Sequence, residues 1–182
     1  MKSEHRLAEA LREMMCEVPL DEISVAALTK KCHLNRQSFY YHFHDIYDLL
    51  TQVFLDEKIP ELDNVTNLKE MTTELYKYYT KNKLFLDATI FSAGKDLFQE
   101  FVYNKTYATI LRFVNCNYLG KSLHINDRKS IARFYALGYA YSIVYYISTH
   151  KTKTLEGLLN SLAFISDENI GKSMQNMAEI RK

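Results

Sequence analysis

A run of short or flat hydrogen-bonding side chains occupies residues 35–44 of the chain. Its members are Asn35, Arg36, Gln37, Ser38, Tyr40, Tyr41, His42 and His44. An amide such as that of Gln37 can pair with adenine through two hydrogen bonds, and a guanidinium such as that of Arg36 can pair with guanine or hold a phosphate. Phenols and imidazoles can also form hydrogen bonds with phosphates. These residue types in one run therefore suit contact with nucleic acid.

Acidic side chains are missing from the segment around this run. No Asp or Glu occurs between Ile23 and His44, although the segment carries Lys30, Lys31 and Arg36. A surface that approaches phosphates excludes carboxylates, because like charges repel. The formal net charge of the whole chain is only +1. The local distribution of charge therefore favours double-stranded DNA as a partner, although Lys30 fits a solvated helix end equally well.

The elements that position these side chains are predicted from apolar spacing and capping residues. Three short helices are expected, over about residues 4–17, 25–32 and 36–44, with Ser24 and Asn35 as the caps of the last two. On the third helix Phe39 and Phe43 lie one turn apart and mark the buried side. Tyr41 is then expected to be more exposed than Tyr40. This arrangement predicts a helix-turn-helix, but the pattern alone fits a groove-facing surface and an ordinary amphipathic surface equally well.

The stretch from Ile23 to Leu50, ISVAALTKKCHLNRQSFYYHFHDIYDLL, resembles the DNA-binding signature of TetR-family bacterial transcription regulators. Ser24 stands at the capping threonine of the signature, Asn35 at its serine, and residues 40–43 match its Tyr-Tyr-His-Phe run. The stretch from Arg36 to Leu50 is similar to one branch, the regulators that resemble activators of dihydroxyacetone kinase operons. Two residues depart from the signature. His33 replaces the turn glycine, and Ile46 stands where many members have a lysine that meets phosphate.

The resemblance implies an all-α fold with two parts. Residues 1–45 would form the helix-turn-helix DNA-binding domain, and residues 46–182 a helical regulatory and dimerisation domain that starts with a linking helix over 46–59. The DNA-binding residues would be Ser24, Lys30, Asn35, Arg36, Gln37, Ser38, Tyr40, Tyr41, His42 and His44. A homodimer would bind a palindromic operator under the control of a small-molecule effector or a co-regulator protein.

The rest of the chain is also expected to be helical, because only two prolines and five glycines interrupt it. Asp45 should cap the fourth helix, and further helices are expected over about 67–81, 84–93, 96–118, 126–149 and from 154 onward. The tail after Ser166 is either a last helix or a frayed end.

The helix expected over about 126–149 is apolar nearly all round, which suits burial by its own domain on one side and by a partner on the other. Gly138 within it costs about 1 kcal/mol relative to alanine, a cost that makes sense if another backbone packs there. A leucine stripe follows in the next helix. The predicted dimer interface contains Gly138, Tyr141, Tyr145, Leu155, Leu158, Leu159 and Leu162. The alternative is the core of a monomer.

Aromatic residues of the larger part could line an effector pocket, with a basic side chain as a polar anchor. The candidates are Tyr76, Tyr79, Phe91, Phe101, Tyr107 and Arg112. For each residue taken singly, ordinary core packing is the alternative.

Other classes of site find little support in the sequence. His42 and His44 point apart on a helix, so no metal site is expected there. Cys16, Cys32 and Cys116 show no metal spacing and are interpreted as free thiols in a reducing cytoplasm. No catalytic motif and no cofactor-binding motif is present, so neither catalysis nor a cofactor is expected. No signal peptide and no membrane span are expected. A small helical enzyme, or a helical adaptor that has lost DNA binding, stays as the alternative function.

Overall fold

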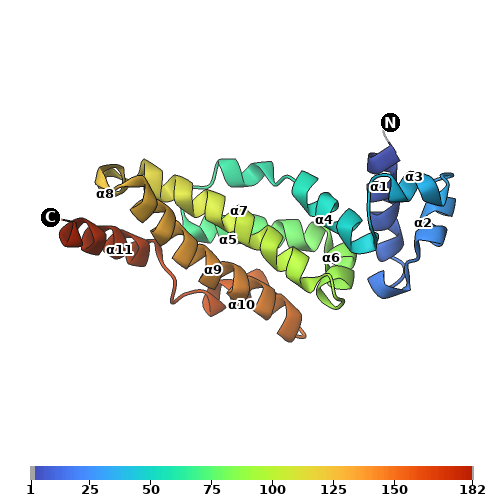
Figure 1. The fold of residues 1–182 in the computed structure, drawn as a ribbon. Helices are drawn as coiled ribbons and strands as arrows, with labels where there is room; N and C mark the ends of the chain where they lie inside the picture. The colour runs from blue at the N-terminus through green and yellow to red at the C-terminus, as the bar shows by residue number, and fades with distance from the viewer. Residues whose placement is uncertain (1–2, 182) are drawn as a thin grey trace. The chain divides into compact units, whose positions relative to one another are not determined.

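The computed structural model describes residues 3–181, and every regular element in that range is a helix (Figure 1). The all-α prediction is thus confirmed. The chain forms two compact units. The first contains Met1–Lys58 and Tyr79–Phe101, and the second contains Ile59–Tyr78 and Val102–Lys182. No helix within the described range is long and apolar enough to cross a membrane.

The first unit is built on the amphipathic helix α1 (Ser3–Met15), whose buried face contains Leu7 and Leu11. This helix packs against α2 (Val25–Lys31), α4 (Ile46–Asp56) and α6 (Lys83–Ile90), while α2 also contacts α3 (Arg36–Tyr40). A short 3-10 helix, Leu20–Glu22, joins α1 to α2. The buried side chains of α2, α3 and α4 include Leu28, Phe39 and Leu49, each of which is fully shielded from solvent. A single apolar core therefore fixes how α2 and α3 are presented.

The second unit has α9 (Ile125–Thr149) as its main buried helix, which contacts both α10 (Leu155–Ser161) and α11 (Asp167–Ile180). The Tyr139 hydroxyl of α9 bonds with the Thr72 hydroxyl and donates to the carbonyl of Leu68, both in α5 (Leu68–Lys81). Burial raises the pKa of the Tyr139 phenol to about 12, so the phenol stays neutral. The chain passes between the two units three times: between Lys58 and Ile59, within α5, and within α7 (Lys95–Cys116). A second 3-10 helix, Pro60–Asp63, and the short helix α8 (Tyr118–Ser122) complete the chain.

The third helix is shorter than the sequence predicts: α3 ends at Tyr40, not near His44. The reason lies in the start of α4. Asp45 caps that helix from an extended backbone, with its carboxylate 2.8 Å from the amide nitrogen of Asp48. The Asp48 carboxylate in turn accepts a hydrogen bond from the amide of His44, at 3.0 Å. Because the amide of His44 and the side chain of Asp45 are bonded to Asp48 at the start of α4, α3 cannot continue through these residues.

Two later elements, α8 and α11, also differ from the expectation or resolve it. Helix α8 was not predicted: the sequence predicts one helix over about 96–118 that stops before Gly120, whereas Gly120 lies inside α8. A Cβ at Gly120 would lie 1.8 Å from the carbonyl oxygen of Val114, so only glycine fits this close approach. The tail forms α11, which opens with a capping box between Ser166 and Asn169. The tail is therefore a last helix and not a frayed end.

Candidate nucleic-acid interface

Ser24 fixes the start of α2 as its capping position predicts. Its hydroxyl accepts a hydrogen bond from the amide of Ala27, at 3.1 Å. Leu28 is buried on one side of the helix, and Lys30 is exposed at its end. The cap and the buried leucine together set which face of α2 remains in solvent.

The turn after α2 bends the chain sharply at His33, whose φ of 51° is the one positive value among the non-glycine residues of the described chain. The amide of His33 donates to the carbonyl of Lys30, and the amide of Leu34 donates to that of Thr29. These two bonds form a Schellman motif, which usually has glycine at the left-handed position. His33 therefore stands where the backbone favours glycine, as the departure from the signature indicates.

Replacing His33 by glycine is expected to stabilise the protein by about 0.5–1 kcal/mol, because relief of the left-handed strain exceeds the entropy that glycine adds to the unfolded chain. Equilibrium unfolding in urea measures the change as a higher midpoint. His33→Ala is the matched control, since it keeps a Cβ at the strained position and should not stabilise. A midpoint that falls for His33→Gly would show that the His33 side chain makes a stabilising contact.

Helix α3 presents the predicted outer face on top of a buried pair. Asn35 caps the helix by accepting from the amide of Ser38 at 2.7 Å. Phe39 is 0% exposed and Phe43 is 7% exposed. Tyr40 is 52% exposed and Tyr41 is 84% exposed. The prediction that Tyr41 is the more exposed of the two tyrosines is thus confirmed.

The exposed residues of this surface are polar, and the contacts between Arg36 and Tyr40 are long. Arg36 donates to the Tyr40 hydroxyl at 3.5 Å and lies over the Tyr40 ring, 6.0 Å from its centre. Gln37 and His44 are also exposed, while Ser38 is partly buried and donates its hydroxyl to the Asn35 side chain. We call the set Lys30, Arg36, Gln37, Tyr40, Tyr41 and His44 the outer face of the helix-turn-helix.

His42 differs from the other predicted residues, because both of its ring nitrogens are used within the protein. The Ser3 hydroxyl lies 3.0 Å from Nε2, and the Glu4 carboxylate lies 2.9 Å from Nδ1. Both partners belong to the first turn of α1. His42 therefore ties the segment after α3 to the start of α1, and a contact to phosphate would have to break these bonds.

Two further cations near the turn are engaged inside the protein. Arg6 donates to the carbonyl of Cys32, which ends α2. Lys31 pairs with Glu13 at 3.0 Å, and the hydrogen bond to this carboxylate raises the pKa of the Lys31 amine. Ile46, at the start of α4, is 7% exposed and belongs to the core. Lys30 and Arg36 are therefore the cations that the outer face presents.

The described residues contain no group of three His, Cys, Asp or Glu side chains that could hold a metal ion. Cys32 is buried and its pKa is raised by that burial, whereas Cys16 and Cys116 are exposed.

The six candidates for effector binding fall into different units of the chain. Tyr79, Phe91 and Phe101 belong to the first unit, and Tyr76, Tyr107 and Arg112 belong to the second. Phe91 is 64% exposed, whereas Phe101 packs against Phe54 and Phe98 in the core of the first unit. Arg112 donates to the carbonyls of Leu62 and Val65, both at 2.8 Å. Arg112 thus holds the segment that leads into α5.

The residues predicted for a dimer interface separate by exposure. Tyr141 and Tyr145 are exposed and stacked, with ring centres 6.1 Å apart. Leu158 and Leu162 are buried within the chain itself, at 0% and 2% exposed. Leu155 and Leu159 are partly buried and line a cavity together with Tyr139. Burial leaves Leu158 and Leu162 with no surface to offer to a partner.

Two exposed residues of α9 were missed by the sequence reasoning: Phe134 is 72% exposed and Leu137 is 55% exposed. Gly138, next to Leu137, is exposed as well. The spacing of three or four residues between these positions and the two tyrosines would have identified the set, because such positions share a helix face. We call Phe134, Leu137, Gly138, Tyr141 and Tyr145 the aromatic face of α9.

Comparison with known proteins agrees with this fold. Residues 66–167, more than half of the chain, match a TetR family model described as "Transcriptional regulator C-terminal region". The protein is thus a transcription regulator. The chain belongs to the TetR family.

A solved structure with a similar fold is the dihydroxyacetone kinase operon activator DhaS, with a TM-score of 0.60 and 19% sequence identity. The alignment covers 96% of this chain and 97% of that one. No curated protein matches the chain. The similarity to DhaS extends over nearly the whole chain and concerns the fold.

Proposed function

We propose that the protein is a homodimeric, sequence-specific DNA-binding regulator that holds a palindromic operator in double-stranded DNA. The observation that carries the proposal is the outer face of the helix-turn-helix. Its residues are exposed, free of carboxylates and supported from below by the buried rings of Phe39 and Phe43. Such a surface can enter a major groove without electrostatic or steric penalty.

Each part of the outer face has a chemical role in this proposal. Gln37 reads a base through its amide, and Arg36 pairs with guanine or a phosphate. Tyr41 donates its hydroxyl to a phosphate, and Lys30 adds a charge contact at the end of α2. Ser24 and Asn35 position the two helices through the caps that they form, and Ser38 supports the second cap by donating its hydroxyl to the Asn35 side chain. His42 positions α1 against the segment after α3.

The aromatic face of α9 supports the homodimer. Exposed apolar side chains that share one helix face are typical of an interaction surface. Its partner in this proposal is the same face of a second copy, since a two-fold axis brings identical surfaces together. The two recognition helices then meet half-sites about 34–36 Å apart.

Control of DNA binding is assigned to the regulatory part, residues 46–182, by a small-molecule effector or a co-regulator protein. Effector binding would change the spacing or tilt of the two recognition helices by moving the linking helix α4. A regulator of this kind acts in the cytoplasm, where its operator is.

The test is footprinting and gel-shift assays with the DNA upstream of the protein's own gene and its neighbours, over a series of salt concentrations. We expect a palindromic footprint and an affinity that falls steeply with salt. The logarithm of the binding constant should fall against the logarithm of the salt concentration with a slope of about −0.9 per phosphate contact. A labelled fragment of scrambled sequence is the control and should show only weak, non-specific binding. Binding that is equal on both fragments would contradict the proposal.

A further inference from the structure

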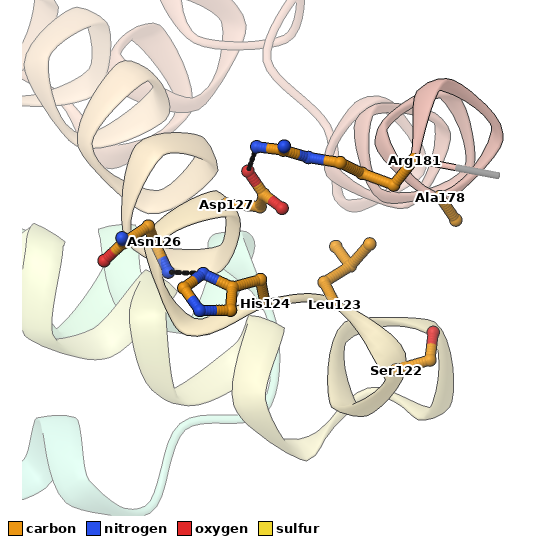
Figure 2. A pocket seen from close by; sticks show the side chains of 7 residues that line it. All are labelled: Ser122, Leu123, His124, Asn126, Asp127, Ala178 and Arg181. Carbon is orange, nitrogen blue, oxygen red and sulfur yellow. Dashed lines mark hydrogen bonds and ion pairs between the residues drawn. The ribbon is translucent and has the colours of Figure 1, made fainter.

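The second unit contains a cavity of about 680 Å³ next to the start of α9. Leu123 and His124 line it just before that helix, Asp127 lines it from the first turn, and Ala178 and Arg181 line it from the end of the chain (Figure 2). Helices α8 and α9 both contact α11 here. The cavity therefore lies entirely within one unit.

Asp127 is the buried charge of this cavity, with a side chain only 6% exposed. Its Oδ1 atom accepts a hydrogen bond from the Arg181 guanidinium at 2.7 Å. Its Oδ2 atom is buried and has no hydrogen-bond partner among the described residues. In Figure 2 the second carboxylate oxygen points away from the bonded guanidinium nitrogen, toward the side of the cavity where Leu123 and Ala178 lie. A buried carboxylate oxygen without a donor is costly, so this atom favours a ligand that donates.

The other lining groups narrow the chemistry of that ligand. Leu123 and Ala178 provide apolar surface beside the carboxylate. His124 accepts a hydrogen bond from the amide of Asn126 at Nδ1, so the neutral ring carries its proton on Nε2. The Arg181 side chain is 64% exposed. Its guanidinium can therefore move into solvent when a second cation approaches Asp127. The Asp127 carboxylate repels anions and attracts cations.

We propose that this cavity binds small organic cations in which a primary ammonium group is joined to a short apolar body. The ammonium donates to Oδ2 of Asp127, and the apolar body lies against Leu123 and Ala178. An ammonium suits the position because it is compact and carries three donors. A metal ion would need several carboxylate, thiolate or imidazole ligands, and the described residues offer no group of three. The site does not depend on DNA binding and can be tested without an operator.

The first test uses the full chain and n-butylammonium chloride as the probe. The midpoint temperature of thermal unfolding should rise by roughly 3–6 °C when the probe concentration is ten times its dissociation constant. Isothermal titration measures that dissociation constant separately. The neutral analogue n-butanol, and sodium chloride at equal ionic strength, should give no comparable shift. An equal shift with n-butanol would overturn the ammonium assignment. An equal shift with sodium chloride would overturn it as well, because the stabilisation would then come from ionic strength and not from binding in the cavity.

Variants then locate the site. Asp127→Asn keeps the shape of the side chain and removes its charge, so affinity for n-butylammonium should fall at least about tenfold. Asp96→Asn is the matched control, because Asp96 is an exposed carboxylate in the first turn of α7 and its loss should leave binding unchanged. Unchanged binding by Asp127→Asn would overturn the proposal.

A third variant keeps the proposal testable if Asp127→Asn does not fold. Arg181→Ala removes the competing cation from an exposed position, so binding of n-butylammonium should be unchanged or tighter. Loss of binding in Arg181→Ala would overturn the proposal, because a cation that binds the Asp127 carboxylate cannot lose affinity when a competing cation is removed.

Discussion

Replacing Gln37 by alanine and Tyr41 by phenylalanine in one variant is expected to lower affinity for the specific operator by about 2–4 kcal/mol, or roughly 30- to 1000-fold. In the proposed complex, the Gln37 amide would lose its two hydrogen bonds to a base, and the Tyr41 phenol would lose its hydrogen bond to a phosphate. Both side chains are exposed, so the fold should be unaffected. Gel-shift titration on operator and scrambled DNA measures specific and non-specific affinity side by side.

The matched control carries the same two chemical changes on the second unit, Gln175→Ala with Tyr118→Phe. Gln175 is exposed and Tyr118 is 87% exposed. This variant should bind the operator as the parent protein does. If specific binding survives undiminished in the Gln37 and Tyr41 variant, those residues do not face the groove and the assignment of the outer face is wrong.

The second large effect is expected at the aromatic face of α9. Leu137→Glu combined with Tyr141→Glu would place unpaired charges inside the proposed interface, at a cost of about 3–5 kcal/mol. The dimer should dissociate at micromolar concentration. Operator affinity should then fall as well, because the two recognition helices are no longer held together to bind both half-sites at once. Sedimentation measures the first effect, and gel shift measures the second.

The control for this variant changes two exposed apolar residues away from α9, Leu55→Glu with Tyr118→Glu. These side chains are 68% and 87% exposed. The control should remain a dimer. A parent protein that sediments as a monomer would remove the dimer from the proposal, and a Leu137 and Tyr141 variant that remains dimeric would move the interface to another surface.

Capping residues made the helix starts predictable from the sequence, because a cap is a local interaction within four residues. Ser24, Asn35, Asp45 and Thr154 were each assigned to a helix start, and each accepts a hydrogen bond from the third residue beyond it. The exposure order of Tyr40 and Tyr41 was also predictable, since Phe39 fixes the inward direction of the same turn.

Other features depend on contacts between distant residues and could not be predicted. The early end of α3 follows from Asp48, which captures the amide of His44 from the next helix. Nothing near Lys31 in the sequence reveals that Glu13 pairs with it. His42 lies in a run that suits phosphate contact. Its ring nitrogens are instead bonded to Ser3 and Glu4, which are far from it in the sequence. The polarity of this surface was predictable, whereas the choice of which charges remain available was not.

The aromatic face of α9 has a consequence for how the proposed regulator responds to its own abundance. A lone subunit leaves Phe134 and Tyr141 in water, at 72% and 58% exposed, and covers them only by pairing. While monomers predominate, the concentration of the DNA-binding form then rises with the square of the subunit concentration. Under this proposal, a doubling of expression raises the amount of paired protein about fourfold, so operator occupancy responds to gene dosage more steeply than that of a monomeric regulator.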